Sequence, residues 1–321
     1  MTNSSGEKNQ EKIPLIIDTD MSPDSWVAVL FAALHPNADL LAVSVSGTGE
    51  AHGPAGARNA QRLVSLAGKG DIPVAFGRPH PFKGREHFPN LMRFVIDHMF
   101  WKKPPRVDPA PALSDSVALI SKLLRESKQK VTFAAVGPQT NLAAVITQYP
   151  QLTDKIKAIY MMGGALNVPG NIKEIAMWKS NTTAEWNFFC DPLGAKTVLG
   201  SGVPIFLVPL DATNQIPVTG DFLARLSEQV ESPAGKFVLD MLTLLVVKLR
   251  AGTNFYLWDP ITTACALDPA VGSFEKRRVD VVTQFGQEWG RILDSEKGTP
   301  IFSASVLDRE KFEQTIIHTL S

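Results

Sequence analysis

The stretch IPLIIDTDMSPDSWVAVLFAAL, residues 13–34, is the part of the chain that decides the fold. Its first part, residues 13–18, is a continuous apolar run that ends in an acid, which is typical of a buried parallel strand. From residue 24 onward the apolar residues recur at helical spacing. A buried strand that leads directly into a helix predicts the first unit of a parallel sheet with crossover helices.

The same alternation of apolar runs and helical patterns continues along the chain. It predicts further strands at 40–47, 72–77, 131–137, 156–164 and 203–211, and helices at 56–68, 114–127 and 140–150. We therefore expect an α/β fold, with an open, mostly parallel sheet and helices on both faces. Residues 1–12 are expected to form a disordered tail and 13–321 a single domain, with a long irregular loop at 78–107.

The composition narrows the class of protein. The 321 residues include 32 Lys+Arg and 32 Asp+Glu, and this zero net charge argues against a nucleic-acid partner. Two cysteines are too few for a disulfide framework or a cysteine zinc cluster. The polar N-terminus lacks the pattern of a signal peptide, and the apolar stretch 238–247 falls short of the ~20 residues that span a bilayer. We expect a reduced, cytoplasmic protein without a membrane partner.

Three carboxylates, Asp18, Asp20 and Asp24, lie within seven residues where the first strand ends. In open parallel sheets, ligands bind outside the carboxyl ends of the strands. Carboxylates that are this close repel one another unless a cation or a shared proton relieves them. Clustered oxygen ligands suit a hard divalent ion such as calcium or magnesium. For Asp24 alone, the alternative is a cap on the following helix.

Several separated motifs carry a resemblance to one enzyme family. Residues 18–34 resemble the DTDxGxDDxxA opening motif of the inosine–uridine-preferring nucleoside hydrolases. Residues 136–143, VGPQTNLA, resemble the VGPLTNLA element of that family. Residues 47–49 and 58–60 resemble the second-strand segment of the family. Its MGG…N…EFN block is matched by residues 161–164, Asn171 and 185–188, and its HDP/WDP motif by residues 257–260.

The resemblance implies calcium-dependent hydrolysis of the N-glycosidic bond of a ribonucleoside, giving ribose and free base. It implies that Asp20 is the general base for a metal-activated water, and that Asp20, the Thr140 main-chain carbonyl and the Asp259 carboxylate hold Ca²⁺. It also implies a homodimer or homotetramer and a small nucleoside or N-riboside as the partner. The implied substrate-binding residues are Asp24, Asn171, Glu185, Asn187 and Trp258.

The chain departs from the family pattern at Ser25, where the second aspartate of the DD pair would stand. A neutral hydroxyl removes a full charge from the site, so we expect calcium to bind more weakly. The alternatives are therefore a diverged, non-hydrolytic member that binds a riboside or sugar with little or no calcium, and a hydrolase of an unusual N-riboside.

A second departure is Trp258, at a position where some members carry a histidine that is proposed to protonate the leaving base. Tryptophan is no general acid, but its ring can stack on a purine and raise the proton affinity of the base, so we expect a purine preference and a catalytic role for Trp258. Four histidines in loops could meet the base, and three nearby aromatics could line its pocket or simply pack. These residues are His52, His80, His87, His98, Phe188, Phe255 and Tyr256.

Overall fold

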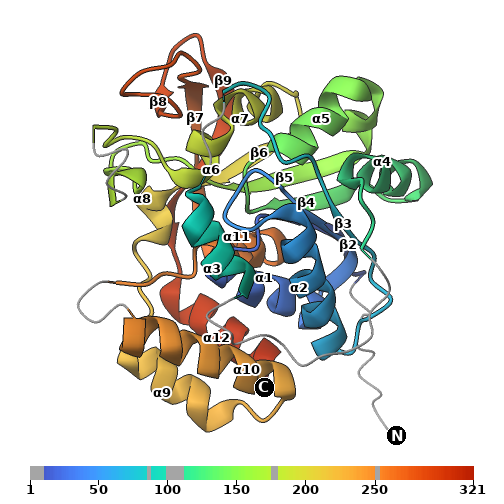
Figure 1. Ribbon diagram of the computed structural model, residues 1–321, viewed down its shortest axis with the longest axis vertical. Coiled ribbons are helices and arrows are strands. Elements are labelled where there is room, and N and C mark those ends of the chain that lie inside the picture. The colour runs from blue at the N-terminus through green and yellow to red at the C-terminus, as the bar shows by residue number, and fades with distance from the viewer. Residues whose placement is uncertain (1–10, 85–87, 99–111, 175–179, 250–253) are drawn as a thin grey trace, which may run out of the picture.

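The computed structural model describes residues 11–84, 88–98, 112–174, 180–249 and 254–321. Within them a nine-stranded sheet has the order β3-β2-β1-β4-β5-β6-β9-β7-β8 (Figure 1). The strands from β3 to β9 in this order are parallel, while β7 pairs antiparallel with both β9 and β8. The open, mostly parallel sheet is therefore confirmed.

Six strands correspond to those predicted from apolar runs. They are β1 (Ile13–Thr19), β2 (Ala38–Val45), β3 (Val74–Phe76), β4 (Val131–Ala135), β5 (Ile156–Met162) and β6 (Ile205–Val208). Three strands near the C-terminus were not predicted: β7 (Gly272–Val281), β8 (Ile292–Asp294) and β9 (Thr299–Leu307). Most of β7 is exposed or half-buried, so it lacks the continuous apolar run that marks a buried parallel strand.

Helices cover both faces of the sheet, as expected (Figure 1). One hydrophobic core lies under α1 (Pro23–Leu34), α2 (Gly53–Leu66), α9 (Gly220–Gln229), α10 (Pro233–Thr243), α11 (Trp258–Leu267) and α12 (Arg309–Leu320). The other lies under α4 (Ser116–Glu126), α5 (Thr140–Gln148) and α7 (Pro192–Leu199). The remaining helices are α3 (Asn90–His98), α6 (Trp186–Cys190) and α8 (Leu210–Thr213). The segment 78–107, expected to be irregular, thus contains a helix.

The apolar run from residue 238 continues from α10 into a π-helical turn, Leu244–Leu249. Its buried residues, such as Val238, Met241 and Leu242, belong to the core. In the part of the chain that the structure describes, no helix is both long and apolar enough to cross a membrane.

Helix α1 is buried along nearly its whole length, from Asp24 to Ala33, because α2, α11 and α12 pack around it. The Ser22 hydroxyl caps its N-terminus by accepting a hydrogen bond from the Ser25 main-chain N–H. Pro23 follows at the first helical position, where its missing N–H costs nothing. These residues fix the first turn of α1 directly after β1.

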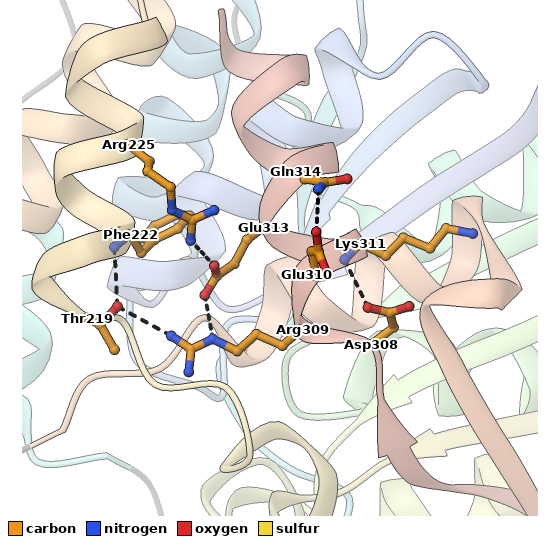
Figure 2. A network of polar contacts seen from close by, with 9 residues as sticks. All are labelled: Thr219, Phe222, Arg225, Asp308, Arg309, Glu310, Lys311, Glu313 and Gln314. Atoms are coloured by element: carbon orange, nitrogen blue, oxygen red, sulfur yellow. Dashed lines mark hydrogen bonds and ion pairs between the residues drawn. The ribbon is translucent and has the colours of Figure 1, made fainter.

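A buried carboxylate ties α12 to α9 (Figure 2). Glu313 accepts hydrogen bonds from Arg225 of α9 and, at 2.8 Å, from Arg309 Nε. Arg309 also donates to the Thr219 hydroxyl at 3.3 Å, and that hydroxyl caps α9 by accepting from the Phe222 N–H at 3.2 Å. The network joins α9 to α12, and α12 in turn packs against α1.

The order of the strands reverses between β1 and β4. From β1 the chain proceeds to β2 and β3 on one side, and from β4 to β5 and β6 on the other. The two central strands pair directly, with Asp18 opposite Ala135. Ligands of open α/β sheets bind at such a switch point, outside the carboxyl ends of the strands. The acids after β1 therefore lie where this topology places a ligand site.

Candidate active site

Three buried carboxylates, Asp20, Asp24 and Asp259, converge from separate segments of the chain. Asp20 follows β1, Asp24 lies in the first turn of α1, and Asp259 lies in the first turn of α11. Asp24 Oδ2 accepts a hydrogen bond of 2.9 Å from the Asp259 main-chain N–H. The Ser25 hydroxyl donates to Asp259 Oδ2 and, at 3.5 Å, to Asp20 Oδ1. The structure thus brings together three of the predicted site residues.

Two serine hydroxyls lie among these carboxylates. Ser22 Oγ is 2.7 Å from Asp24 Oδ1, 2.8 Å from Ser25 Oγ and 3.2 Å from Asp259 Oδ2. Ser22 was missed as a site residue, although it stands at the glycine of the DTDxGxDD pattern and could have been found there. The departures at Ser22 and Ser25 therefore each place a neutral hydroxyl inside the acid cluster.

Burial disfavours the ionised form of these carboxylates and so raises the pKa values of Asp18, Asp20 and Asp259. It raises the pKa of Asp20 to about 6, with the charge of Asp24 adding to the effect. Burial and the charges of Asp24 and Asp20 raise the pKa of Asp259 well above its usual range. Burial also raises the pKa of Asp18 to about 7, although Ser44 and Asn141 donate hydrogen bonds to it. The cluster therefore favours the uptake of positive charge.

Neighbouring loops hold Asp20 closely. Asp20 Oδ2 accepts from the Glu50 main-chain N–H at 3.0 Å, and the Asp20 carbonyl accepts from the Ala51 N–H at 3.0 Å. A Cβ at Gly49 would lie 2.3 Å from Asp20 Oδ2, and one at Gly137 would lie 2.6 Å from the Asp20 nitrogen. No side chain fits at that separation, so glycine is required at both positions for Asp20 to keep its place.

The donor atoms decide whether a metal ion suits the site. In the described parts of the chain, no group of three or more His, Cys, Asp or Glu side chains is arranged to hold a metal ion. The side-chain groups that meet around Asp20 and Asp259 are nevertheless all oxygens, which calcium and magnesium prefer. Ser25 supplies a hydroxyl where the motif has the second aspartate of its DD pair. The chemical type of these ligand atoms therefore suits a hard divalent cation, but the site carries one negative charge fewer than the family motif would supply.

Thr140 is the first residue of α5, and its side chain is fixed. Its hydroxyl donates to Asp191 Oδ2 at 2.7 Å and lies 2.9 Å from the Thr48 hydroxyl. These contacts hold the start of α5, which follows β4 and so lies next to the strand that carries Asp20. The use of the Thr140 carbonyl as a metal ligand stays a prediction.

The predicted ribose-binding residues lie at the same edge of the sheet. Asn187 Nδ2 donates to the carbonyls of Val136 and Met162, at 3.3 and 3.2 Å, where β4 and β5 end. The buried Glu185 carboxylate caps α6, and burial raises its pKa to about 7 although several main-chain N–H groups donate to it. Asn171 Oδ1 accepts from the Trp186 N–H at 3.1 Å. Each side chain is oriented by the protein, and its contact with ribose stays a prediction.

A family model gives this arrangement its context. The model of the inosine-uridine preferring nucleoside hydrolases matches residues 15–314. The chain belongs to this family. It is accordingly an N-glycosyl hydrolase of the nucleoside hydrolase type.

Relatives and solved structures agree with this assignment. The chain is 32% identical over 284 residues to the pyrimidine-specific ribonucleoside hydrolase RihA of Citrobacter koseri, with 85% of each chain covered. It is 31% identical over 325 residues to the RihA of Shewanella sp. strain MR-7, with 96% of each covered.

Two solved structures superpose over nearly the whole chain. The plant nucleoside hydrolase PpNRh1 has a TM-score of 0.84 at 27% identity, covering 96% of this chain and 98% of that one. The purine-preferring ribonucleoside hydrolase of Gardnerella vaginalis has a TM-score of 0.79 at 24% identity, with the same coverage, and supports the fold.

In this nucleoside hydrolase, Trp258 begins α11 directly before Asp259. Its indole Nε1 donates to Asn214 Oδ1 at 3.1 Å, and its ring packs against Phe255 and Tyr256 at centroid distances of 5.7 and 5.4 Å. Phe188, by contrast, is fully buried in the core. The structure therefore groups Trp258 with two of the three candidate aromatics and gives Phe188 a packing role.

The candidate histidines differ in their surroundings. His52 precedes α2, and its Nδ1 lies 2.7 Å from Asp97 Oδ2 of α3. His98 Nδ1 bonds to the Phe94 carbonyl of its own helix, and His80 is exposed after β3. His87 lies outside the described residues. Asp97 was missed from the sequence, because only the tertiary structure brings residue 97 to residue 52.

Proposed function

We propose that this nucleoside hydrolase cleaves ribonucleosides to ribose and free base, with Asp20 as the general base that accepts a proton from the attacking water. The buried cluster of Asp20, Asp24 and Asp259 supports this proposal, because one carboxylate is held by main-chain N–H groups with two others beside it. A pKa of about 6 suits Asp20 to accept a proton near neutral pH.

The surrounding residues would bind the ribose and stabilise the charge that develops on it. Cleavage of the glycosidic bond builds positive charge on the ribose ring, and the negative charge of the buried cluster would stabilise it in the transition state. We assign Asp24 to ribose hydroxyls at the cluster, and Asn171, Glu185 and Asn187 to the other ribose hydroxyls, including the 5′-hydroxyl. Their hydrogen bonds to the main chain hold these groups in place before substrate arrives.

Calcium, when bound, would be held by Asp20, Asp259 and the Thr140 carbonyl, and would lower the pKa of a nearby water. We propose that this chain binds calcium more weakly than a protein with the full DD pair, because Ser25 adds no charge. We further propose a homodimer or homotetramer, which light scattering of the purified protein would test.

Two observations favour different nucleobases in the substrate. Relatives that are 31 to 32% identical over most of the chain are named pyrimidine-specific, so the expected purine preference is not supported by them. We therefore propose pyrimidine ribonucleosides as the first substrates to test. Purine ribonucleosides are the second candidate, because Trp258 lies next to Asp259 with a ring that could stack on a purine. In that case Trp258 would act in catalysis by favouring protonation of the base.

The alternative to hydrolysis is a diverged member that binds a riboside without cleaving it, which is favoured by the Ser25 hydroxyl at the position of the second aspartate of the DD pair. Hydrolysis of an unusual N-riboside is a third proposal. All three proposals share the sugar site and differ in whether a common nucleoside is cleaved.

The deciding experiment measures ribose release from uridine, cytidine, inosine and adenosine, with calcium and with a chelator. We expect release from at least one nucleoside, and a loss of about 1000-fold or more in the Asp20→Asn variant. Asp39→Asn, which changes an exposed aspartate of β2, is the matched control. No release from any nucleoside at millimolar calcium would overturn the hydrolase proposal, and riboside binding without release would favour the binding function.

A further inference from the structure

His52 and Asp97 form an oriented pair next to the segment that bonds to Asp20. His52 Nδ1 lies 2.7 Å from Asp97 Oδ2, while Asp97 Oδ1 accepts from the His52 main-chain N–H at 2.8 Å. The Asp97 carbonyl in turn accepts from Asn59 Nδ2 of α2 at 3.0 Å. The Asp97 side chain is 9% exposed and that of His52 is 44% exposed. One largely buried carboxylate therefore fixes both the main chain and the ring of a half-exposed histidine.

The loop that carries His52 is the same loop that closes on Asp20. Glu50 donates its N–H to the Asp20 carboxylate, and the Ala51 N–H bonds to the Asp20 carbonyl. His52 is the next residue along the chain. On the other side, Arg93 of α3 donates to the Gly47 and Ala51 carbonyls at 2.8 and 2.7 Å, which holds this loop against the helix that carries Asp97. The pair is thus anchored to Asp20, the proposed general base.

The reaction also needs an acid for the leaving group. A departing base carries an electron pair from the broken bond, and protonation of the base makes it a far better leaving group. Trp258, next to Asp259, has no titratable group for this task. Imidazole is the side chain most often used as an acid near neutral pH, and a carboxylate on one ring nitrogen leaves the other for the ligand.

Resting on the proposed function, we propose that His52 is the acid that protonates the leaving base and that Asp97 is its positioning residue. The C1′–N bond breaks and its electron pair goes to the base, which takes the proton of His52 Nε2. The water oxygen forms the new bond to C1′, and its proton goes to Asp20. Solvent then reprotonates His52 and removes the proton from Asp20, so that one water is consumed.

The test compares two leaving groups on one sugar. The best nucleoside of the panel needs a proton on its base, whereas 4-nitrophenyl β-D-ribofuranoside releases a phenolate that needs none. For His52→Gln we expect kcat/KM to fall about 100-fold or more with the nucleoside, but by about threefold or less with the nitrophenyl riboside. Asp97→Asn should show the same dependence on the leaving group, with a loss of about tenfold on the nucleoside.

His318→Gln, which changes an exposed histidine of α12, is the matched control and should leave both activities unchanged. Thermal unfolding of each variant checks that it is folded. Equal losses on both substrates in His52→Gln, or no loss on either, would overturn the proposal. If the unmodified protein released ribose from neither substrate, the proposed function itself would fail, and the role of His52 with it.

Discussion

The hydroxyl of Ser25 donates a hydrogen bond to Oδ2 of Asp259, a residue 234 positions further along the chain. This contact joins the first turn of α1 to the first turn of α11. It also places a neutral group where the family motif has a carboxylate, so the charge of the site depends on this position.

Restoring that carboxylate should strengthen calcium binding. We expect Ser25→Asp to lower the dissociation constant for Ca²⁺ by about tenfold or more, because the charge of the ligand set controls calcium affinity. Isothermal titration calorimetry measures the change. Ser227→Asp, which adds the same charge at an exposed position on α9, is the control. An unchanged affinity in Ser25→Asp would show that another group already supplies the missing charge.

A methyl group at Gly49 should displace Asp20, the proposed general base. The added Cβ would lie 2.3 Å from Asp20 Oδ2, so the carboxylate must move. We expect Gly49→Ala to lower kcat/KM for ribose release by about 100-fold, which is the scale of a small misplacement in an active site. At Gly220 a Cβ would meet no atom within 4 Å, so Gly220→Ala should retain activity. Equal activities of the two variants would contradict the assigned position of Asp20.

The buried Glu185 should make stability depend on pH. Burial raises its pKa from 4.5 to about 7, so the folded protein holds this proton more tightly than the unfolded chain. Its stabilising contribution is complete below about pH 4.5 and is lost as the pH rises through about 7.

The variant Glu185→Gln cannot titrate at this position. The unfolding free energy of the unmodified protein, relative to that of Glu185→Gln, should therefore fall by about 2 kcal/mol between pH 5 and pH 8. Urea denaturation at the two pH values measures this difference, with Glu228→Gln at an exposed site as the control. A difference that does not change with pH would contradict the raised pKa.

The buried Glu313 should contribute to stability without affecting the site. Glu313→Gln removes the charge that Arg225 and Arg309 share (Figure 2). Since both arginines are partly exposed, we expect a moderate loss of about 2 kcal/mol in the free energy of unfolding. Denaturation curves measure it, and Glu310→Gln on the same helix is the control. If both variants were equally stable, the network would have no net effect.

The sequence predicted the parallel strands from β1 to β6 because buried parallel strands have continuous apolar runs, but it did not predict β9, which pairs parallel with β6. The same criterion failed for β7, where Glu275, Lys276, Arg277 and Arg278 follow one another in a strand that is mostly exposed or half-buried. Such a strand is recognised through its pairing with β9, which depends on residues about 30 positions away.

Only those site residues that belong to a recognisable sequence motif could be predicted. Asp20, Asp24 and Asp259 belong to motifs, and the structure joins them through hydrogen bonds. Ser22 was visible in the sequence as a departure from the motif but was overlooked. Asp97 belongs to no motif, and its contact with His52 depends on how α3 packs over the loop after β2.

The hydrogen bond between Asp24 and the main chain of Asp259 has a consequence during synthesis on the ribosome. The segments of β1 and α1 emerge first, but the acid cluster stays incomplete until α11 has emerged and docked. Proteolytic fragments that lack α11 would likewise keep the first two carboxylates without the third. Ribose release is therefore expected only from chains in which α11 has docked, and chains that end or are cut before α11 should be inactive.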